Sequence, residues 1–222
     1  MNPAAPQKIH MPQLPKHLPG QAFESLEDHG EYSEIELGNC SFAQQTAQDL
    51  LFEQVRMKRV GFAGSRLQRL RILDARIEVC DISGAAWEKA RFRRVEFVGC
   101  RFLGVQLLEA QLEDVFFKDC VLEGSQFAEA RFKTVRFENC NLRNTSFEQA
   151  EAGGTTFYRC DLGQANFQGS KLERADFRGS TISGMHVGAR ELQGAIIDST
   201  QAVQIVGLLG IRVQDEDAAD VR

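Results

Sequence analysis

Large apolar side chains recur at every fifth position along most of this chain. From Leu37 to Ile197, every residue whose number ends in 2 or 7 is apolar, which makes 33 consecutive quintets, and 14 of the 16 phenylalanines fall on this register. Two residues earlier in each quintet the side chain is usually small, as at Ala75, Cys80 and Ala85. A period of five fits neither an α-helix nor a continuous β-strand, so the pattern predicts short extended segments that bend at each corner.

The cysteines indicate how many segments make one turn. All six lie at multiples of 20, namely Cys40, Cys80, Cys100, Cys120, Cys140 and Cys160. Four quintets therefore complete one coil, and the sequence predicts a four-sided parallel β-helix over residues 35–197, with about eight coils and a length of roughly 38–40 Å at the usual strand spacing. In this register the cysteines are small core residues stacked one per coil, because a disulfide or a zinc site needs sulfurs that converge.

A few positions depart from the dominant pattern. Ala47 and Ala152 underfill the large inward position and Trp87 overfills it, so we expect local irregularities there. Gly84, Gly104, Gly124 and Gly184 are separated by multiples of 20 residues, which predicts corner residues rather than a phosphate-binding loop.

The N-terminal end differs in composition from the repeats. All five prolines lie within the first 20 residues, and residues 21–36 hold six acidic residues and no lysine or arginine. We therefore expect residues 1–34 to form a flexible arm and an acidic lead-in. The β-helix then occupies 35–197, and 198–222 form a C-terminal capping or dimerisation segment.

The C-terminal segment predicts one short helix. Asp198 or Ser199 can cap its N-terminus, and Gly210 can end it before the strand-like run 211–213. The apolar face of this helix carries Ala202, Ile205, Val206 and Leu209. An open β-helix end exposes core and unpaired backbone, so a capping or dimerising element is expected at this point.

Charge is distributed unevenly among the sides of the predicted coil. On the side centred on Leu107, Phe127 and Phe147, the outward residues Glu109, Glu129 and Glu148 form a candidate acidic stripe for a partner. The side centred on Phe92 and Phe132 carries Arg91, Arg93, Arg94, Arg131 and Lys133, interleaved with Glu113 and Asp114. Alternating signs favour charge ladders on a solvated surface. As an alternative, the arginine-rich side could bind an acidic partner or nucleic acid.

The sequence offers no constellation for catalysis. His10, His17, His29 and His186 are scattered, and burial of the inward cysteines suppresses their reactivity. We therefore expect no catalytic residues, no cofactor and no metal, and the protein is not predicted to be an enzyme. The sequence also contains no apolar run long enough to span a bilayer and no secretory signal, which predicts a cytoplasmic protein without membrane contact.

Individual quintets resemble those of a known repeat family. The segments CNLRN (140–144), CDLGQ (160–164), ANFQG (165–169) and ADFRG (175–179) are similar to the A(D/N)LXX pattern of pentapeptide-repeat proteins. The resemblance covers nearly three quarters of the chain and implies a right-handed quadrilateral β-helix. It implies no function by itself, because the family is functionally mixed.

The C-terminal run LQGAIIDSTQAVQIVGLLGIRV (192–213) resembles the tail of Qnr and mycobacterial fluoroquinolone-resistance proteins. The matching positions are Leu192, Gln193, Gly194, Asp198, Gln201, Ala202, Leu209, Gly210, Ile211 and Val213. The resemblance implies a homodimer that protects DNA gyrase or topoisomerase IV from poisons by imitating duplex DNA, without binding nucleic acid itself. The expected dimer interface comprises Ala202, Ile205, Val206, Leu208, Leu209, Ile211 and Val213.

Two features depart from that subgroup. One branch of Qnr proteins interrupts the repeats with loops, for which the unbroken quintets leave no room, although the mycobacterial branch lacks these loops. Residues 41–197 contain 20 acidic and 22 basic residues, a net charge of +2, which differs from the dense negative charge of a DNA duplex. The alternative is a pentapeptide-repeat scaffold that binds an unidentified partner.

Overall fold

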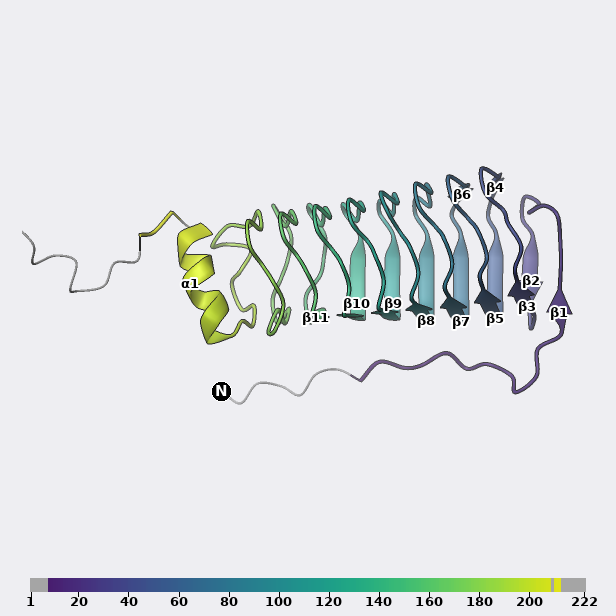
Figure 1. Cartoon of the computed structure of the whole chain (residues 1–222), viewed down its shortest axis with the longest axis horizontal. Coiled ribbons are helices and arrows are strands. Elements are labelled where there is room, and N and C mark those ends of the chain that lie inside the picture. The colour runs from purple at the N-terminus through teal and green to yellow at the C-terminus, as the bar shows by residue number, and fades with distance from the viewer. Residues whose placement is uncertain (1–7, 209, 213–222) are drawn as a thin grey trace, which may run out of the picture.

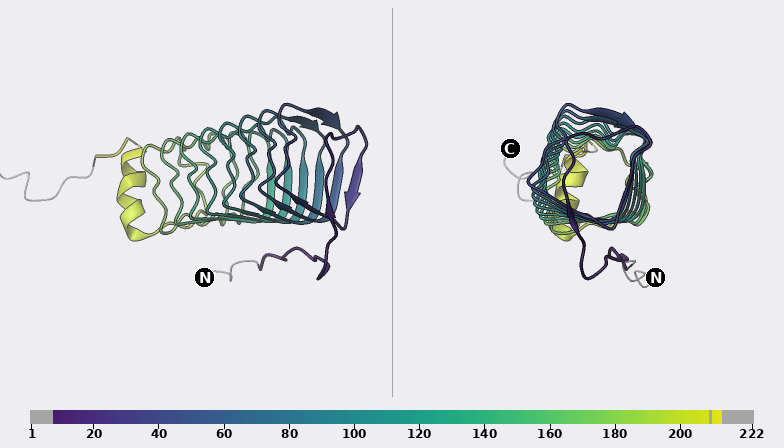
Figure 2. Two further views of the ribbon diagram at one scale, coloured as in Figure 1. Left: turned by 45° about the vertical axis from the view of Figure 1, so that its right-hand side comes forward. Right: turned by 90° about the vertical axis from the view of Figure 1, so that its right-hand side faces the viewer.

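A computed structural model describes residues 8–208 and 210–212 of the chain. The repeats wind into a four-sided parallel β-solenoid, and one helix closes its C-terminal end (Figure 1, Figure 2). The elements are β1 Gly20–Gln21, β2 Glu31–Ser33, β3 Glu36–Gly38, β4 Thr46–Gln48, β5 Leu51–Lys58, β6 Arg66–Gln68, β7 Arg71–Glu78, β8 Arg91–Val98, β9 Gln111–Lys118, β10 Arg131–Glu138, β11 Thr156–Tyr158 and α1 Ser199–Leu208.

Neighbouring strands pair in parallel with a register of 20 residues. Strands β5, β7, β8, β9 and β10 lie side by side, so that Phe97 pairs with Phe117 and Phe117 with Phe137. On another face, single bridges connect residues at every twentieth position from Ser41 to Thr181. This column has eight levels joined by seven steps, or about 34 Å at the usual strand spacing. The prediction of four quintets per turn is confirmed.

Each corner of the solenoid is made by one residue in the left-handed conformation. From 29 to 184, every residue whose number ends in 4 or 9 has a positive φ. Glycine adopts this conformation without a steric penalty, as at Gly84 (φ 64°) and Gly104 (φ 62°), so the predicted corner role of these glycines is confirmed. The long strands therefore bend in the middle, at Asp74 in β7 and Asp114 in β9, and each covers two adjacent faces.

The core is a set of stacked rings along the solenoid axis. Phe97, Phe117, Phe137, Phe157 and Phe177 form one column, with ring centroids 4.7–5.3 Å apart and interplanar angles of at most 11°. These phenylalanines are fully buried. Each contributes roughly 1.5–3 kcal/mol of burial, and each also contacts the rings above and below it. The stability of a coil therefore depends on its neighbours.

The cysteines form a second inward column, as predicted. Cys80, Cys100, Cys120, Cys140 and Cys160 are buried, and the six thiols are free. The Cys80 backbone N–H donates to the Cys100 sulfur at 3.4 Å. Contacts with the Cys100 and Cys140 thiols, together with burial, raise the pKa of Cys120. Burial in the core limits access to the five thiols from Cys80 to Cys160, which act as small packing residues.

The expected irregularities do not interrupt the ladders. Ala47 pairs with Leu67, and Ala86, next to Trp87, bridges to Arg66 and Gln106. The Trp87 indole N–H donates to the Ser65 hydroxyl at 3.0 Å inside the core. Ser65 occupies the small inward position one level below, so it leaves room for the larger ring. The local irregularity that we expected at Trp87 therefore does not interrupt the ladder at Ala86.

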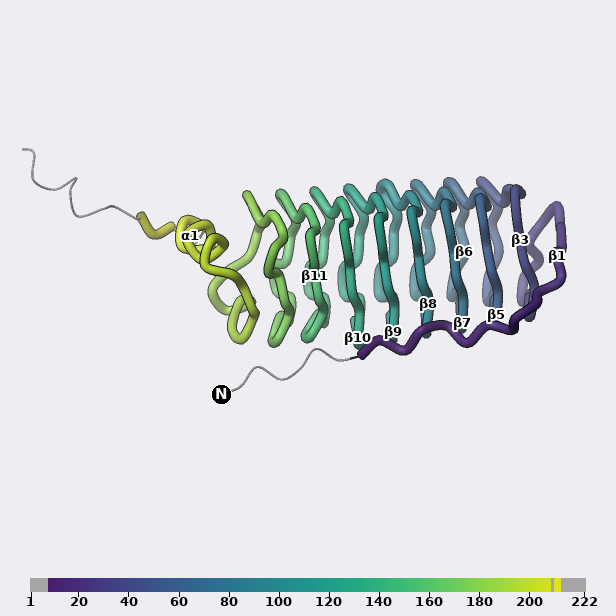
Figure 3. Tube along the Cα trace, turned by 60° about the horizontal axis from the view of Figure 1, so that its bottom comes forward, coloured from purple at the N-terminus to yellow at the C-terminus, as the bar shows by residue number. Residues whose placement is uncertain are grey.

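The N-terminal arm lies along the outside of the solenoid (Figure 3). The backbone N–H groups of His10 and Gln13 donate to the carboxylates of Asp114 and Asp74 at 3.3 and 2.9 Å. Strand β1 then pairs with β3 and joins the arm to the first coil. Within the arm that we expected to be flexible, His10 and Gln13 therefore contact the corner residues Asp114 and Asp74.

Candidate interaction surfaces

The candidate acidic stripe of Glu109, Glu129 and Glu148 is brought together by the fold. Glu109 and Glu129 occupy corners of successive levels, with φ values of 54° and 58°. The Glu129 backbone N–H donates to the Glu148 carbonyl at 2.9 Å, which places Glu148 on the next level beside them. All three residues are exposed. Lys89, one level below, lies 3.6 Å from Glu109 and neutralises that end of the stripe.

The C-terminal helix α1 is tied to the last coil by a reciprocal cap. The Asp198 carboxylate accepts the backbone N–H of Gln201 at 2.9 Å, and the Gln201 side chain accepts the Asp198 backbone N–H at 3.0 Å. The same carboxylate also accepts the Gly179 N–H at 3.0 Å. The predicted cap at Asp198 and the helix end before Gly210 (φ 75°) are therefore confirmed.

Gln201 also covers the open end of the solenoid. Its amide donates to the carbonyls of Phe177 and Ser180 at 2.6 and 2.7 Å, and the residue is only 3% exposed. Sequence reasoning assigned the buried face to apolar residues and missed this glutamine. The signal was present, because an Asp followed three residues later by Gln is a capping-box pattern.

The expected dimer residues divide into two groups in the structure. Ile205 is 8% exposed and packs on the solenoid of its own chain, while Ala202, Val206 and Leu208 are half-buried. Ile211 is 57% exposed. Val203, which was not among the expected interface residues, is 60% exposed. Leu209 and Val213 lie outside the described residues. The helix therefore turns one face to the core and presents apolar side chains outward.

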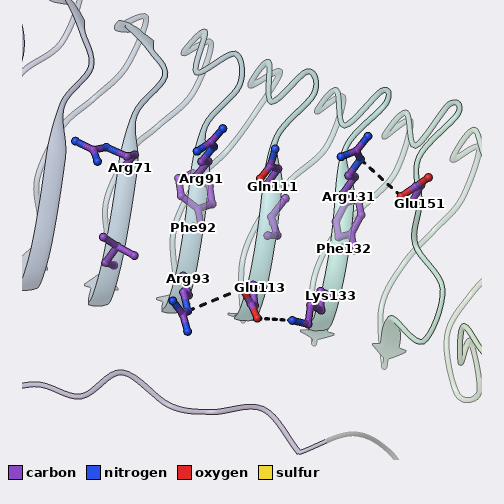
Figure 4. Close-up of a pocket in the computed structure, with 12 residues that line it drawn as sticks. Arg71, Arg91, Phe92, Arg93, Gln111, Glu113, Arg131, Phe132, Lys133 and Glu151 are labelled. Atoms are coloured by element: carbon purple, nitrogen blue, oxygen red, sulfur yellow. Dashed lines mark hydrogen bonds and ion pairs between the residues drawn. The ribbon is translucent and has the colours of Figure 1, made fainter.

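The arginine-rich side forms a groove, here termed the arginine groove, of about 570 Å³. Its cationic residues come from the first halves of β7, β8 and β10, and Figure 4 shows them along two lines on the outside of the sheet. One line contains Arg71, Arg91 and Arg131, and the other contains Arg93, Glu113 and Lys133. Leu73 is half-buried in the groove, and Phe92 and Phe132 lie beneath it.

Many surface charges pair with the level above or below. Glu113 lies 2.6 Å from Lys133 and 3.9 Å from Arg93, and Glu151 lies 2.7 Å from Lys171 and 3.6 Å from Arg131. Asp74 pairs with Arg94 in the same way. The predicted charge ladders are therefore present on the solvated faces.

Two further features of the described residues concern metal binding and membrane spanning. Within residues 8–208 and 210–212, no cluster of three His, Cys, Asp or Glu side chains could hold a metal ion. In the same part of the chain, no helix is long and apolar enough to cross a membrane.

A repeating 20-residue coil with an inward phenylalanine ladder defines a β-solenoid repeat protein. A family model described as the pentapeptide repeat region matches residues 71–147 and 130–202, which together exceed half of the chain. The chain belongs to the pentapeptide repeat family, as its quintets predicted.

Solved structures of this kind resemble the chain at low identity. A trypsin-treated variant of QnrB1, a plasmid-mediated fluoroquinolone resistance protein, is 20% identical with a TM-score of 0.42, covering 88% of this chain and 95% of that one. Full-length QnrB1 is 16% identical with a TM-score of 0.35, covering 82% and 100%. A pentapeptide repeat protein from the cyanobacterium Cyanothece 51142 is 24% identical with a TM-score of 0.30, covering 42% and 60%. No curated protein matches the chain.

Proposed function

We propose that this protein is a non-catalytic homodimer that binds DNA gyrase or topoisomerase IV and protects the enzyme from a fluoroquinolone or another poison. The main support for this proposal is the sequence of the C-terminal tail. Residues 192–213 resemble the tail of the topoisomerase-protecting subgroup. In support, hydrogen bonds of Asp198 and Gln201 with Gly179, Phe177 and Ser180 hold the start of helix α1 against the last coil.

The outward face of the tail supports dimerisation through this end. Gln201 and Ile205 cover the solenoid core, which leaves Val203 and Ile211 mostly exposed beside Ala202, Val206 and Leu208. A two-fold contact between two such ends would bury these apolar side chains and produce a longer rod. Leu209 and Val213, outside the described residues, belong to the same proposed interface.

The acidic stripe is the proposed contact with the topoisomerase. Glu129 and Glu148 have no ion pair within the described part of the chain, so their charges are available to a partner. The solenoid as a whole is close to neutral, and mimicry of DNA would therefore be local to this stripe. We expect the rod to act through protein contacts and not to bind nucleic acid itself.

A supercoiling assay with purified gyrase tests the proposal. Reactions contain relaxed plasmid, a fluoroquinolone at a concentration that stabilises cleaved DNA, and the protein at micromolar concentration. We expect less cleaved plasmid and restored supercoiling. If the protein neither protects nor inhibits gyrase and topoisomerase IV, the proposal is wrong, and an interaction scaffold with another partner becomes the better explanation.

Matched variants make the assay specific. Glu129→Gln with Glu148→Gln removes the unpaired charges and should weaken protection, whereas Glu173→Gln changes an exposed carboxylate on another face and should not. Equal protection by both variants would contradict the role of the stripe. Truncation before Asp198, followed by a mass measurement in solution, tests the interface, because a truncated chain that remains dimeric would exclude it.

A further inference from the structure

Two neighbouring arginines of the arginine groove lack the ion pairs that many other surface charges form. Arg71 and Arg91 are register partners on β7 and β8, one level apart. Like charges directly opposite each other on adjacent strands destabilise a sheet. Neither guanidinium forms an ion pair within residues 8–208 and 210–212, and Asp49, which feels the charge of Arg71, pairs with Arg69. The fold therefore tolerates an uncompensated pair of positive charges at this position.

The surroundings increase the positive charge. Arg93, Arg131 and Lys133 line the same groove, and its only carboxylates among the described residues are Glu113 and Glu151. Figure 4 shows that Glu113 lies on one line between Arg93 and Lys133, while Arg71 and Arg91 have no acidic neighbour on the other line. A groove of about 570 Å³ is thus locally positive in a chain whose net charge is −5.

We propose that the arginine groove binds an acidic polypeptide segment in an extended conformation. One carboxylate of the segment lies between Arg71 and Arg91, and a second lies at Arg131. Guanidinium groups bind carboxylates through paired hydrogen bonds, and a carboxylate shared by two arginines removes their mutual repulsion. This proposal is independent of topoisomerase binding, because it concerns a different face and a partner of opposite charge.

The distance between levels sets the spacing that we expect between acidic residues of the bound peptide. Levels are about 4.8 Å apart, so the midpoint of Arg71 and Arg91 lies roughly 12 Å from Arg131 along the axis, or three to four extended residues. The N-terminal arm shows how many extended residues span two levels at the neighbouring corner. Its residues His10 and Gln13, three apart, reach Asp114 and Asp74, which are two levels apart. The matching ligand therefore carries acidic residues three or four positions apart.

The groove fits a peptide better than a nucleic acid. Glu113 and Glu151 lie among the cations, where they would repel a continuous phosphate backbone but can face the uncharged positions of a peptide. Phe92 and Phe132 are 1% and 6% exposed, so they offer no platform on which bases could stack. Leu73 is half-buried and can contact apolar side chains between the acids.

The test measures binding of a fluorescein-labelled peptide with the repeated pattern Glu-Ala-Leu, using the full chain and fluorescence anisotropy. We expect saturable binding that weakens as salt rises, and no binding of the matched peptide with Gln in place of Glu. Arg71→Gln with Arg91→Gln should weaken binding at least tenfold. The control Arg101→Gln removes an exposed arginine on another face and should bind as the parent does.

A thermal melt separates loss of the site from loss of the fold. Because the double variant removes a like-charge contact, its melting temperature should equal or exceed that of the parent. Equal peptide affinity in parent and double variant would overturn the proposal, as would binding of neither Glu nor Gln peptide at millimolar concentration. Binding of a thymidine oligonucleotide without binding of the acidic peptide would overturn it in favour of a nucleic-acid surface.

Discussion

The left-handed corner is the residue-scale feature that shapes the molecule. Val79 is the least suited of these corner residues, because it is β-branched, has a φ of 54° and is 58% exposed. We predict that Val79→Gly stabilises the protein by about 1 kcal/mol, since the left-handed conformation costs a non-glycine residue roughly 1–2 kcal/mol. Urea unfolding followed by circular dichroism measures the change.

The matched control lies one level above. Gly99 has a φ of 63°, and a β-carbon there would meet only the Val79 side chain, at 3.9 Å. Gly99→Ala should therefore destabilise the protein by about 1 kcal/mol through backbone strain alone. A stabilising effect of Gly99→Ala, or a destabilising effect of Val79→Gly, would contradict the corner assignment.

The Trp87 indole gives a second prediction at the residue scale. Ser65→Ala leaves the buried indole N–H without its acceptor, which should cost about 1–3 kcal/mol. In a Trp87→Phe background the same Ser65→Ala change should cost less, because no donor remains to be satisfied. A double-mutant cycle by urea unfolding measures this coupling, and an additive result would show that the hydrogen bond contributes nothing.

At the scale of elements, the phenylalanine column predicts a graded response along the rod. Phe137 is stacked between Phe117 and Phe157, whereas Phe177 lies at the end of the described column. We predict that Phe137→Ala costs about 3–5 kcal/mol and loosens coils on both sides. Hydrogen exchange should show lost protection of backbone amides in the coils of both Phe117 and Phe157. A loss confined to one of these coils would contradict the stacked arrangement.

The C-terminal cap predicts a specific pH dependence. Backbone N–H groups of Gly179 and Gln201 lower the pKa of Asp198 below its ordinary value. Its contribution to stability is therefore present above the ordinary carboxyl pKa and is lost as the pH falls through the lower folded-state pKa. We predict that Asp198→Asn lowers the melting temperature at pH 7 and that the difference from the parent shrinks under strong acid. A difference that does not change with pH would exclude the carboxylate as the cap.

The sequence predicted the inward columns correctly but not the local contacts of Trp87 and Gln201. The period of five defined the inward columns because burial selects the side-chain type at Phe117 and Cys120 directly. It also predicted irregularity at Trp87, because a one-dimensional pattern does not show that Ser65 lies beneath it. The deep burial of Gln201 was missed for a related reason, since its carbonyl partners come from a coil more than 20 residues earlier.

At the scale of the whole molecule, the arm lies along several levels of the rod. Burial raises the pKa of Asp74, but the hydrogen bond with Arg94 and the backbone N–H of Gln13 in the arm together keep it below its ordinary value. The sequence could not place the arm, because prolines exclude helix but do not select a docking surface. The three-residue spacing of His10 and Gln13 can be interpreted only beside a ladder in which Asp74 and Asp114 lie two levels apart.

The acidic stripe and the arginine groove give one rod two surfaces of opposite character. The sequence identified both sides, because outward residues at 20-residue intervals stack in register. It could not show which charges are neutralised, such as Glu109 by Lys89, and which have no ion pair among the described residues, such as Arg71 and Arg91. That distinction depends on side-chain geometry between levels.

The central functional claim is that this rod occupies the DNA-binding surface of a topoisomerase. The most direct measurement is equilibrium binding of the labelled protein to purified gyrase, with linear duplex DNA added as a competitor. We expect saturable binding that duplex DNA displaces and that Glu129→Gln with Glu148→Gln weakens. Binding that persists unchanged at saturating DNA, or no binding at micromolar gyrase, would contradict it.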